Sequence, residues 1–201
     1  MLDSIAGIAQ MGDYRHFAEI MTKAMQGWGV LPEHTGYVEG KLISETGELI
    51  FDPDHAQFII ENESCGYFSG APEERIELSE KVSVHAENER ISLALLPGEN
   101  GGEYLLTAMG NTGMDETTVE EGPEVMPGYH FNVVKMAGKL YADTLEGVIN
   151  VKGAARLVAL DPTGREICEV NGVQTENRTQ FTLDGSIPSV NFVLKIAKRN
   201  S

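Results

Sequence analysis

Carboxyl groups are the most abundant groups in this sequence that could do chemistry, with 31 Asp and Glu among 201 residues. Cleavage of a glycosidic bond needs two of them facing one sugar at a defined separation. Adjacent pairs such as Glu73-Glu74 and Glu120-Glu121 point apart on an extended chain, because successive side chains of a strand alternate between its faces. No spacing singles out one pair, so the carboxyl groups alone do not predict an active site.

Other catalytic and metal-binding patterns are also missing from the sequence. The five histidines are scattered singly, without the H-x-H or H-E-x-x-H spacing of zinc sites. The segment at residues 66–70 (GYFSG) lacks the G-x-S-x-G spacing of a serine nucleophile, and no glycine pattern for phosphate or dinucleotide binding occurs. We therefore expect the chain to carry no catalytic residue. Cys65 and Cys168 specify neither a disulfide framework nor a metal site, so buried free thiols are expected, with one bridge as the alternative.

Two groups of acids could offer oxygen ligands to calcium. Asp52 and Asp54 lie in one predicted turn, and Asp115, Glu116, Glu120 and Glu121 lie in one acidic segment. Neither group follows the spacing of a calcium-binding loop. Solvated acids and no cofactor are therefore the expectation, with calcium as the alternative.

Aromatic side chains are what a carbohydrate-binding surface would use, because sugar C–H faces stack on rings that keep a polar edge in water. Tyr129, Tyr67 and Trp28 are the candidate carbohydrate-binding residues. Trp28 is the only tryptophan, and it also lies on the apolar stripe of a predicted helix, where packing in the core is the favoured interpretation. Tyr129 follows the acidic segment and is better placed to meet a ligand.

The charge balance restricts the partners. A net charge of −16 repels phosphate backbones, so we expect neither nucleic-acid binding nor docking on an anionic membrane. No stretch reaches the roughly 20 apolar residues that span a bilayer. The first ten residues lack the basic start of a signal peptide, which leaves the location open between the cytoplasm and secretion within a longer parent protein.

The first 32 residues are predicted to form a helical segment. Apolar residues recur every three or four positions from Phe17 to Trp28, Asp13 could cap the helix, and Gly27, Gly29 and Pro32 supply stop signals. One amphipathic helix over residues 13–28 follows. Its apolar stripe must pack on the next domain or on another partner.

Residues 33–201 are predicted to form one mainly β domain. Val82, Val84 and Ala86 alternate with polar residues, and residues 161–164 (DPTG) are typical of a type I turn. Ten to twelve short strands at this spacing predict an antiparallel β-sandwich or a related barrel. Residues 110–128 hold five acids and two prolines without a strand pattern, so a long loop is expected there.

Three segments resemble, in order, hairpins of the β-rich region that follows the catalytic barrel in many large glycoside hydrolases. They are residues 44–52 (SETGELIFD), 105–114 (LLTAMGNTGM) and 159–165 (ALDPTGR). Phe51 stands where that region usually has tryptophan, and Glu45 where it has aspartate. Catalytic carboxylates of such enzymes lie on the barrel, which needs about 250 residues and is absent from this chain.

The resemblance implies a non-catalytic accessory β-domain of a glycoside hydrolase. Its expected partner is the catalytic barrel of the same or an associated polypeptide, and carbohydrate is a further candidate ligand. Two alternatives are a stand-alone carbohydrate-binding module and, ranked lowest, a small complete hydrolase. The accessory domain predicts an exposed apolar patch near Phe17 and Trp28, which would also favour a homo-oligomer. The binding module predicts two or three coplanar exposed rings.

Overall fold

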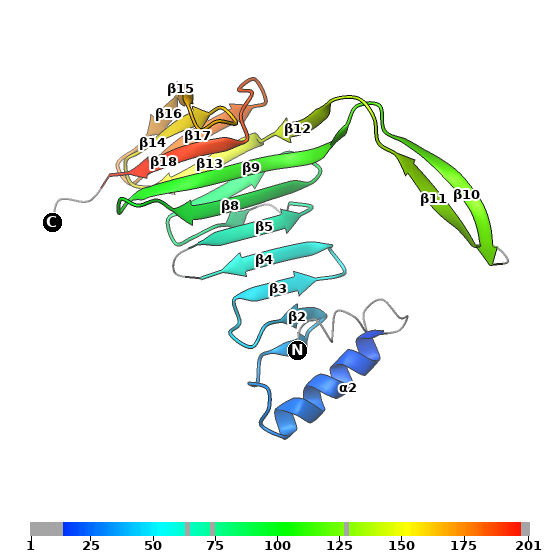
Figure 1. Ribbon diagram of the computed structural model, residues 1–201. Coiled ribbons are helices and arrows are strands. Elements are labelled where there is room, and N and C mark those ends of the chain that lie inside the picture. The colour runs from blue at the N-terminus through cyan, green and yellow to red at the C-terminus, as the bar shows by residue number, and fades with distance from the viewer. Residues whose placement is uncertain (1–13, 63–64, 73–74, 127–128, 198–201) are drawn as a thin grey trace.

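The computed structural model describes residues 14–62, 65–72, 75–126 and 129–197, and it confirms the mainly β fold with one helix near the N-terminus. All of its strand pairs are antiparallel, and they form a β-sandwich-like body (Figure 1). The described residues contain eighteen strands rather than ten to twelve. Several of these strands have only two or three residues, too few to show an alternating pattern.

The larger sheet has eleven strands, ten of which follow one another in the order β1-β2-β3-β4-β5-β8-β9-β18-β14-β15, while β12 pairs with β9 off this path. Their bounds are β1 (Gly36–Val38), β2 (Lys41–Ile43), β3 (Leu49–Asp52), β4 (Gln57–Glu61), β5 (Gly66–Gly70), β8 (Ile91–Pro97), β9 (Glu103–Met114), β18 (Asn191–Ile196), β14 (Ala155–Leu160), β15 (Glu166–Val170) and β12 (Leu140–Thr144).

The smaller sheet has five strands in the order β16-β17-β13-β7-β6. They are β16 (Gly172–Gln174), β17 (Arg178–Asp184), β13 (Glu146–Lys152), β7 (Val82–Ala86) and β6 (Ile76–Glu77). The core between the two sheets is made of alternate apolar residues, because every second side chain of a strand faces inward. Leu93, Leu106, Ile149, Phe181 and Leu194 are among its fully buried members.

Strands β1 to β4 extend beyond the smaller sheet as a single layer, which we call the ladder (Figure 1). The main core contains no fully buried residue from the ladder, and only the half-buried Ile59 packs against it. A second, small cluster joins Ala18 of the helix to Tyr37 and Leu42 of the ladder. Among the residues that the structure describes, the ladder is therefore covered only at its outer end, by the helix.

Helix α2 (Tyr14–Gly27) confirms the predicted amphipathic helix. The face turned to the ladder is that of Ala18 and Thr22, both buried, and the Thr22 hydroxyl accepts a 2.8 Å hydrogen bond from the backbone N–H of Tyr37. Phe17, Ile20 and Trp28 are 47%, 51% and 74% exposed, and we call them the helix stripe. Core packing of Trp28 was therefore a wrong expectation. Successive residues of a helix are about 100° apart around its axis. Ala18 and Thr22, which are small enough to let the helix approach the ladder closely, therefore lie on a face beside the one that carries the large apolar residues.

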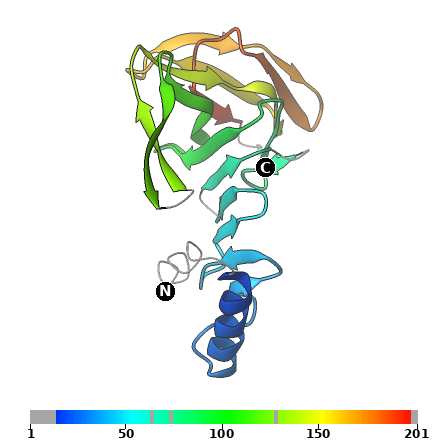
Figure 2. The same cartoon turned by 90° about the vertical axis from the view of Figure 1, so that its right-hand side faces the viewer.

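The segment expected to be a long loop is instead part of a β-ribbon. Strand β9 continues to Met114, and β10 (Thr118–Met126) pairs with β11 (Tyr129–Lys135) in a two-stranded sheet, which we call the arm. Figures 1 and 2 both show the arm standing clear of the body. A ribbon that covers no core has no buried face, so its sequence lacks the alternation on which strand prediction relies.

Candidate functional site

One face of the ladder carries several apolar side chains. Paired residues on neighbouring strands lie on the same face of a sheet, and Phe51 pairs with both Leu42 and Phe58, while Ile60 pairs with Tyr67. Leu42 is the residue under α2, so helix and aromatic rings occupy one face. Phe51 and Phe58 remain 36% and 37% exposed. We call Phe51, Phe58 and Tyr67 the open face.

The opposite face of the ladder is apolar too. Ile43 pairs with Ile50, and Ile50 pairs with Ile59, which in turn pairs with the core residue Phe68. The three isoleucines are only half buried. A single sheet layer thus carries apolar side chains on both sides, a pattern that normally belongs to a sheet covered on both faces.

The sequence contains a signal for this arrangement that its analysis missed. Strands β3 and β4 read Leu49-Ile50-Phe51 and Phe58-Ile59-Ile60, with three apolar residues in a row. Unbroken apolar runs are typical of strands buried on both faces, whereas half-buried strands alternate. Neither Phe51 nor Phe58 was among the candidate binding residues.

The three candidate carbohydrate-binding residues do not form one site. Tyr67 lies on β5, and Trp28 follows α2 beyond the other end of the ladder. Tyr129 pairs with Met126 in the arm, and its side chain is outside the described part of the structure. Only Tyr67 has a described aromatic neighbour, Phe58, whose ring centre lies 6.0 Å away at an interplanar angle of 65°. The two rings pack edge to face, so they offer no shared flat platform for a sugar.

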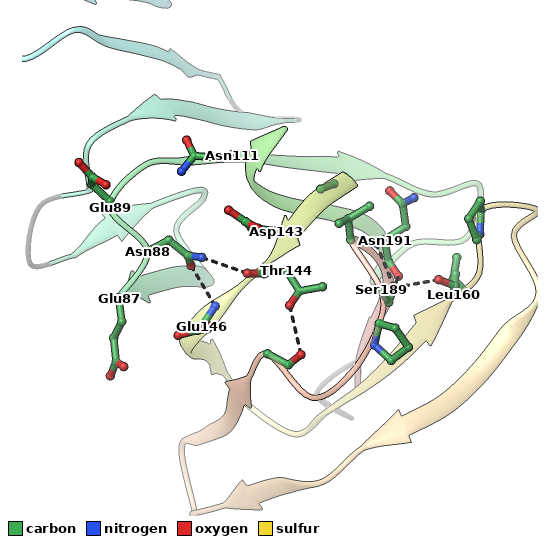
Figure 3. Close-up of a pocket in the computed structure, with 15 residues that line it drawn as sticks. Glu87, Asn88, Glu89, Asn111, Asp143, Thr144, Glu146, Leu160, Ser189 and Asn191 are labelled. Carbon is green, nitrogen blue, oxygen red and sulfur yellow. Dashed lines mark hydrogen bonds between the residues drawn. The ribbon is translucent and has the colours of Figure 1, made fainter. Parts of the chain in front are cut away.

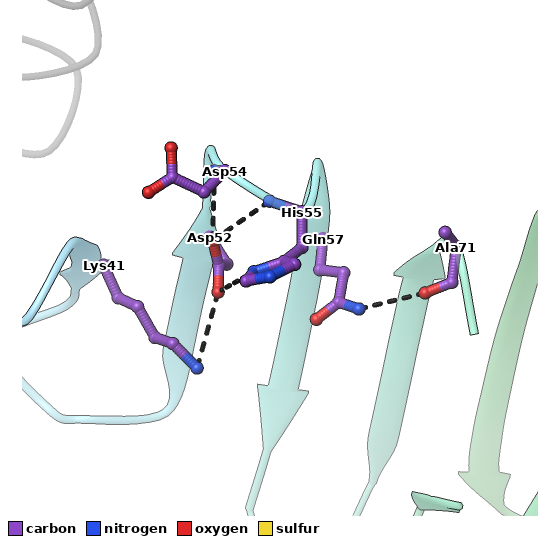
Figure 4. Close-up of polar contacts among 6 residues, drawn as sticks. All are labelled: Lys41, Asp52, Asp54, His55, Gln57 and Ala71. Atoms are coloured by element: carbon purple, nitrogen blue, oxygen red, sulfur yellow. Dashed lines mark hydrogen bonds and ion pairs between the residues drawn. The ribbon is translucent and has the colours of Figure 1, made fainter. Parts of the chain in front are cut away.

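Asp52 is the centre of a polar cluster at one edge of the ladder (Figure 4). Its carboxylate is buried and accepts hydrogen bonds from the backbone N–H groups of Asp54 and His55, at 3.1 and 3.2 Å, and from the His55 ring, at 2.9 Å. The Lys41 ammonium lies 3.5 Å away. Gln57 pairs with Asp52 across the strands and donates a 2.9 Å bond to the Ala71 carbonyl. The cluster therefore fixes the β3–β4 turn, joins β2 to β3 and joins β4 to the chain just after β5.

The pKa of Asp52 results from opposing effects. Burial raises the pKa of this carboxyl group, but the hydrogen bonds from the His55 ring and from the backbone of His55 and Asp54 outweigh burial and lower it below its ordinary value. The group is thus held as an anion by its own turn and by Lys41. The Asp52 carboxylate already has hydrogen-bond and ion-pair partners within the protein. Asp52, one of the two proposed calcium ligands in this turn, therefore has a structural role.

The acids of the other proposed calcium group are spread along the arm. Asp115 accepts a 2.7 Å bond from the backbone N–H of Lys139, and the Glu120 carboxylate lies 2.6 Å from the Lys135 ammonium. Among the residues that the structure describes, no three His, Cys, Asp or Glu side chains gather as metal ligands would. The thiols of Cys65 and Cys168 are free, half buried and exposed respectively, so the expectation of buried thiols was wrong and no bridge joins the two.

A hollow of about 840 Å³ opens at the end of the sandwich where β12 leaves the body (Figure 3). Its described lining mixes polar and apolar residues and contains no aromatic ring; the carboxyl groups are those of Glu87, Glu89, Asp143 and Glu146. They come from the β7–β8 loop, β12 and β13. No spacing rule could have joined residues so far apart in the sequence.

The amides and hydroxyls of this hollow mainly hold its loops together. The Asn88 amide donates a 3.0 Å bond to the Thr144 carbonyl and accepts a 2.9 Å bond from the Glu146 N–H. The Ser189 hydroxyl donates a 2.8 Å bond to the Leu160 backbone carbonyl. The Thr107 hydroxyl donates a 2.9 Å bond to the side-chain oxygen of Asn191. These bonds give the hollow a structural explanation, so it is the weaker candidate for a binding site than the open face.

Comparisons with known proteins returned no matching family model, no matching curated protein and no matching solved structure. Within the described ranges, no helix has the length and apolar character needed to cross a membrane.

Proposed function

We propose that the chain is a non-catalytic accessory β-domain of a glycoside hydrolase, and that it docks on the catalytic barrel through the open face and the helix stripe. One observation carries the docking part of this proposal: the ladder is a single layer with apolar side chains on both faces. The link to glycoside hydrolases rests on the resemblance of residues 44–52, 105–114 and 159–165.

The exposed apolar residues have the distribution expected of a docking surface. Phe51 and Phe58 lie on the face of the ladder on which α2 packs. The helix exposes Phe17 and Ile20, and Trp28 just after it is exposed as well. Large apolar side chains gathered around one element mark an interaction surface, whereas isolated ones are ordinary. The exposure of Phe17 and Trp28 agrees with the patch that the accessory domain predicts there, and in this way supports the proposal.

A carbohydrate-binding module is the second candidate, and the open face supports it less well. Phenylalanine rings lack the polar edge that keeps a sugar-binding ring partly in water, and the ring pair of Phe58 and Tyr67 is not coplanar. A complete small hydrolase would need two carboxyl groups held about 5–10 Å apart across a substrate cleft, and the hollow of Figure 3 is a place where several carboxyl groups line one cavity.

The test mixes the purified chain with the catalytic barrel of the glycoside hydrolase encoded with it, and measures complex formation by calorimetry and by light scattering after gel filtration. A one-to-one complex is expected. The double substitution of Phe51→Ser and Phe58→Ser should weaken it at least tenfold, since large rings at the centre of an interface carry much of the binding free energy. Val173→Ser on β16 is the matched control, because Val173 is 69% exposed but lies on the other sheet.

Three outcomes would overturn the proposal. The barrel does not bind the wild-type chain, or the chain forms only a dimer of itself, or the chain alone hydrolyses a glycoside. Retardation in a polysaccharide gel that is lost with Phe58→Ser would favour the binding module instead.

A further inference from the structure

The arm joins the body at a root, residues 114–115 and 139–140, and continues beyond it as a shaft made of β10 and β11. At the root, Leu140 pairs with Met114, the Asp115 N–H donates to the Lys139 carbonyl at 3.1 Å, and the Lys139 N–H donates to the Asp115 carboxylate at 2.7 Å. Beyond the root, β10 and β11 form a two-stranded sheet, and among the described strands they pair only with each other. The direction of the shaft is thus set by β9 and β12, which belong to the body.

The shaft and the root expose several large apolar side chains. Val119 and Val134, which pair with each other, are 64% and 54% exposed, and Val133 on the opposite face is 40% exposed. Met136 and Leu140 near the root are 65% and 80% exposed. A lone two-stranded ribbon is marginally stable in water, so a surface that contacts these side chains would also stabilise the arm.

Charge indicates what kind of surface this is. Residues 115–139 carry the carboxyl groups of Asp115, Glu116, Glu120, Glu121 and Glu124 against the ammonium groups of Lys135 and Lys139, which gives 2 − 5 = −3. The whole chain carries −16. Pairing of this arm with a second copy would place like charges together, so the complementary surface is basic and apolar.

The arm and the first turn of α2 lie on one side of the ladder. In Figure 1 the arm projects to the right, and the first turn of α2 lies on that same side, while the last turn of α2 lies away from the arm. One globular partner seated at this side can therefore contact the arm and the first half of α2, which carries Phe17 and Ile20.

We propose that the arm is a second binding surface for the partner. In the complex the arm lies along a basic, apolar strip of the same barrel that docks on the open face. This inference depends on the proposed function for the identity of the partner. The open face supplies the buried aromatic contacts, and the arm adds apolar contacts and the electrostatic attraction that speeds association.

The test compares the whole chain with a variant in which residues 118–135 are replaced by Asn-Gly. These two residues form a tight hairpin turn, and the Glu116 N–H to Ala137 carbonyl bond and the Asp115–Lys139 bonds of the root remain. Binding to the barrel is measured by surface plasmon resonance at 50 and 500 mM NaCl. The shortened chain should bind at least tenfold more weakly, and its association rate should lose most of the salt dependence that the whole chain shows.

Hydrogen exchange supplies a second readout that needs no variant. Amides of β10 and β11 should exchange rapidly in the free chain and become protected when the barrel is bound. If the two chains bind with equal affinity and equal salt dependence, and the arm stays unprotected in the complex, the proposal that the arm binds the barrel is wrong. The proposed docking through the open face would not be affected by that result. Absence of any complex for the whole chain would instead overturn the proposed function, so the two failures are distinguishable.

Discussion

At the scale of the residue, Asp52 shows how one buried carboxylate organises a turn. Its four partners come from the turn itself and from Lys41. Replacing Asp52→Asn should lower the free energy of unfolding by about 1–3 kcal/mol at pH 7, because a buried group loses charge-assisted hydrogen bonds. Urea unfolding measures the change, with Glu45→Gln, exposed in the preceding turn, as the matched control.

The pH dependence of this effect has a defined sign. Because the pKa of Asp52 is lowered in the folded protein, its stabilisation is complete above the unfolded value of about 3.9 and is lost as pH falls through the folded value. The stability difference between the wild type and Asp52→Asn should therefore shrink as pH falls below about pH 4. A difference that is undiminished at about pH 2 would contradict the assignment.

Gly66 is the second residue whose identity is set by its neighbours. It begins β5, and a Cβ there would overlap the Leu78 carbonyl oxygen. Gly66→Ala should therefore push the backbone of Leu78 away and cost about 1–3 kcal/mol of unfolding free energy, measured by thermal and urea denaturation. Gly27→Ala is the control: nothing lies within 4 Å of that position at the end of α2, so a neutral or slightly stabilising effect is expected.

At the scale of the element, the ladder is the part of the sheet held by the fewest buried contacts. The main core ends at β5, and the outer cluster has only Ala18, Tyr37 and Leu42 as its buried members. Local opening requires less free energy where fewer apolar groups are buried. Amides of β2 and β3 should thus exchange with solvent at least tenfold faster than those of β13 and β14 in the free chain.

Mass spectrometry of hydrogen exchange, resolved by peptide, checks this gradient. The expected order of protection rises from α2 through the ladder to the sandwich. Uniform protection of both parts would mean that the ladder opens only with the whole domain, and the sheet would then be a single cooperative unit.

At the scale of the whole molecule, the sequence predicted what periodicity controls. Alternation in residues 82–86 identified a core strand, and the three- and four-residue spacing from Phe17 to Trp28 identified the helix. The buried face of this helix was predicted wrongly. Ala18 and Thr22 are buried because their small side chains permit close packing, and a pattern of hydrophobic residues does not reveal this property. The arm was missed because its strands pair without covering anything.

The candidate site was less predictable than the fold. Tyr67 was identified, but Phe51 and Phe58 become its neighbours only through the register of β3, β4 and β5. Register depends on turns and on pairing across the sheet, and a shift of one residue moves every side chain to the other face. The polar hollow near β12 depends in the same way on loops that are distant in the sequence.

The ladder also has a mechanical consequence. Neighbouring strands lie about 4.8 Å apart, so the four steps from β1 to β5 set the helical end of the sheet roughly 19 Å from the start of the sandwich. A single layer twists more readily than two packed layers, because no interdigitated side chains oppose the twist. A rotation of α2 against the sandwich would therefore twist the ladder, and the unbroken strand pairing from β1 to β9 connects that twist to the base of the arm.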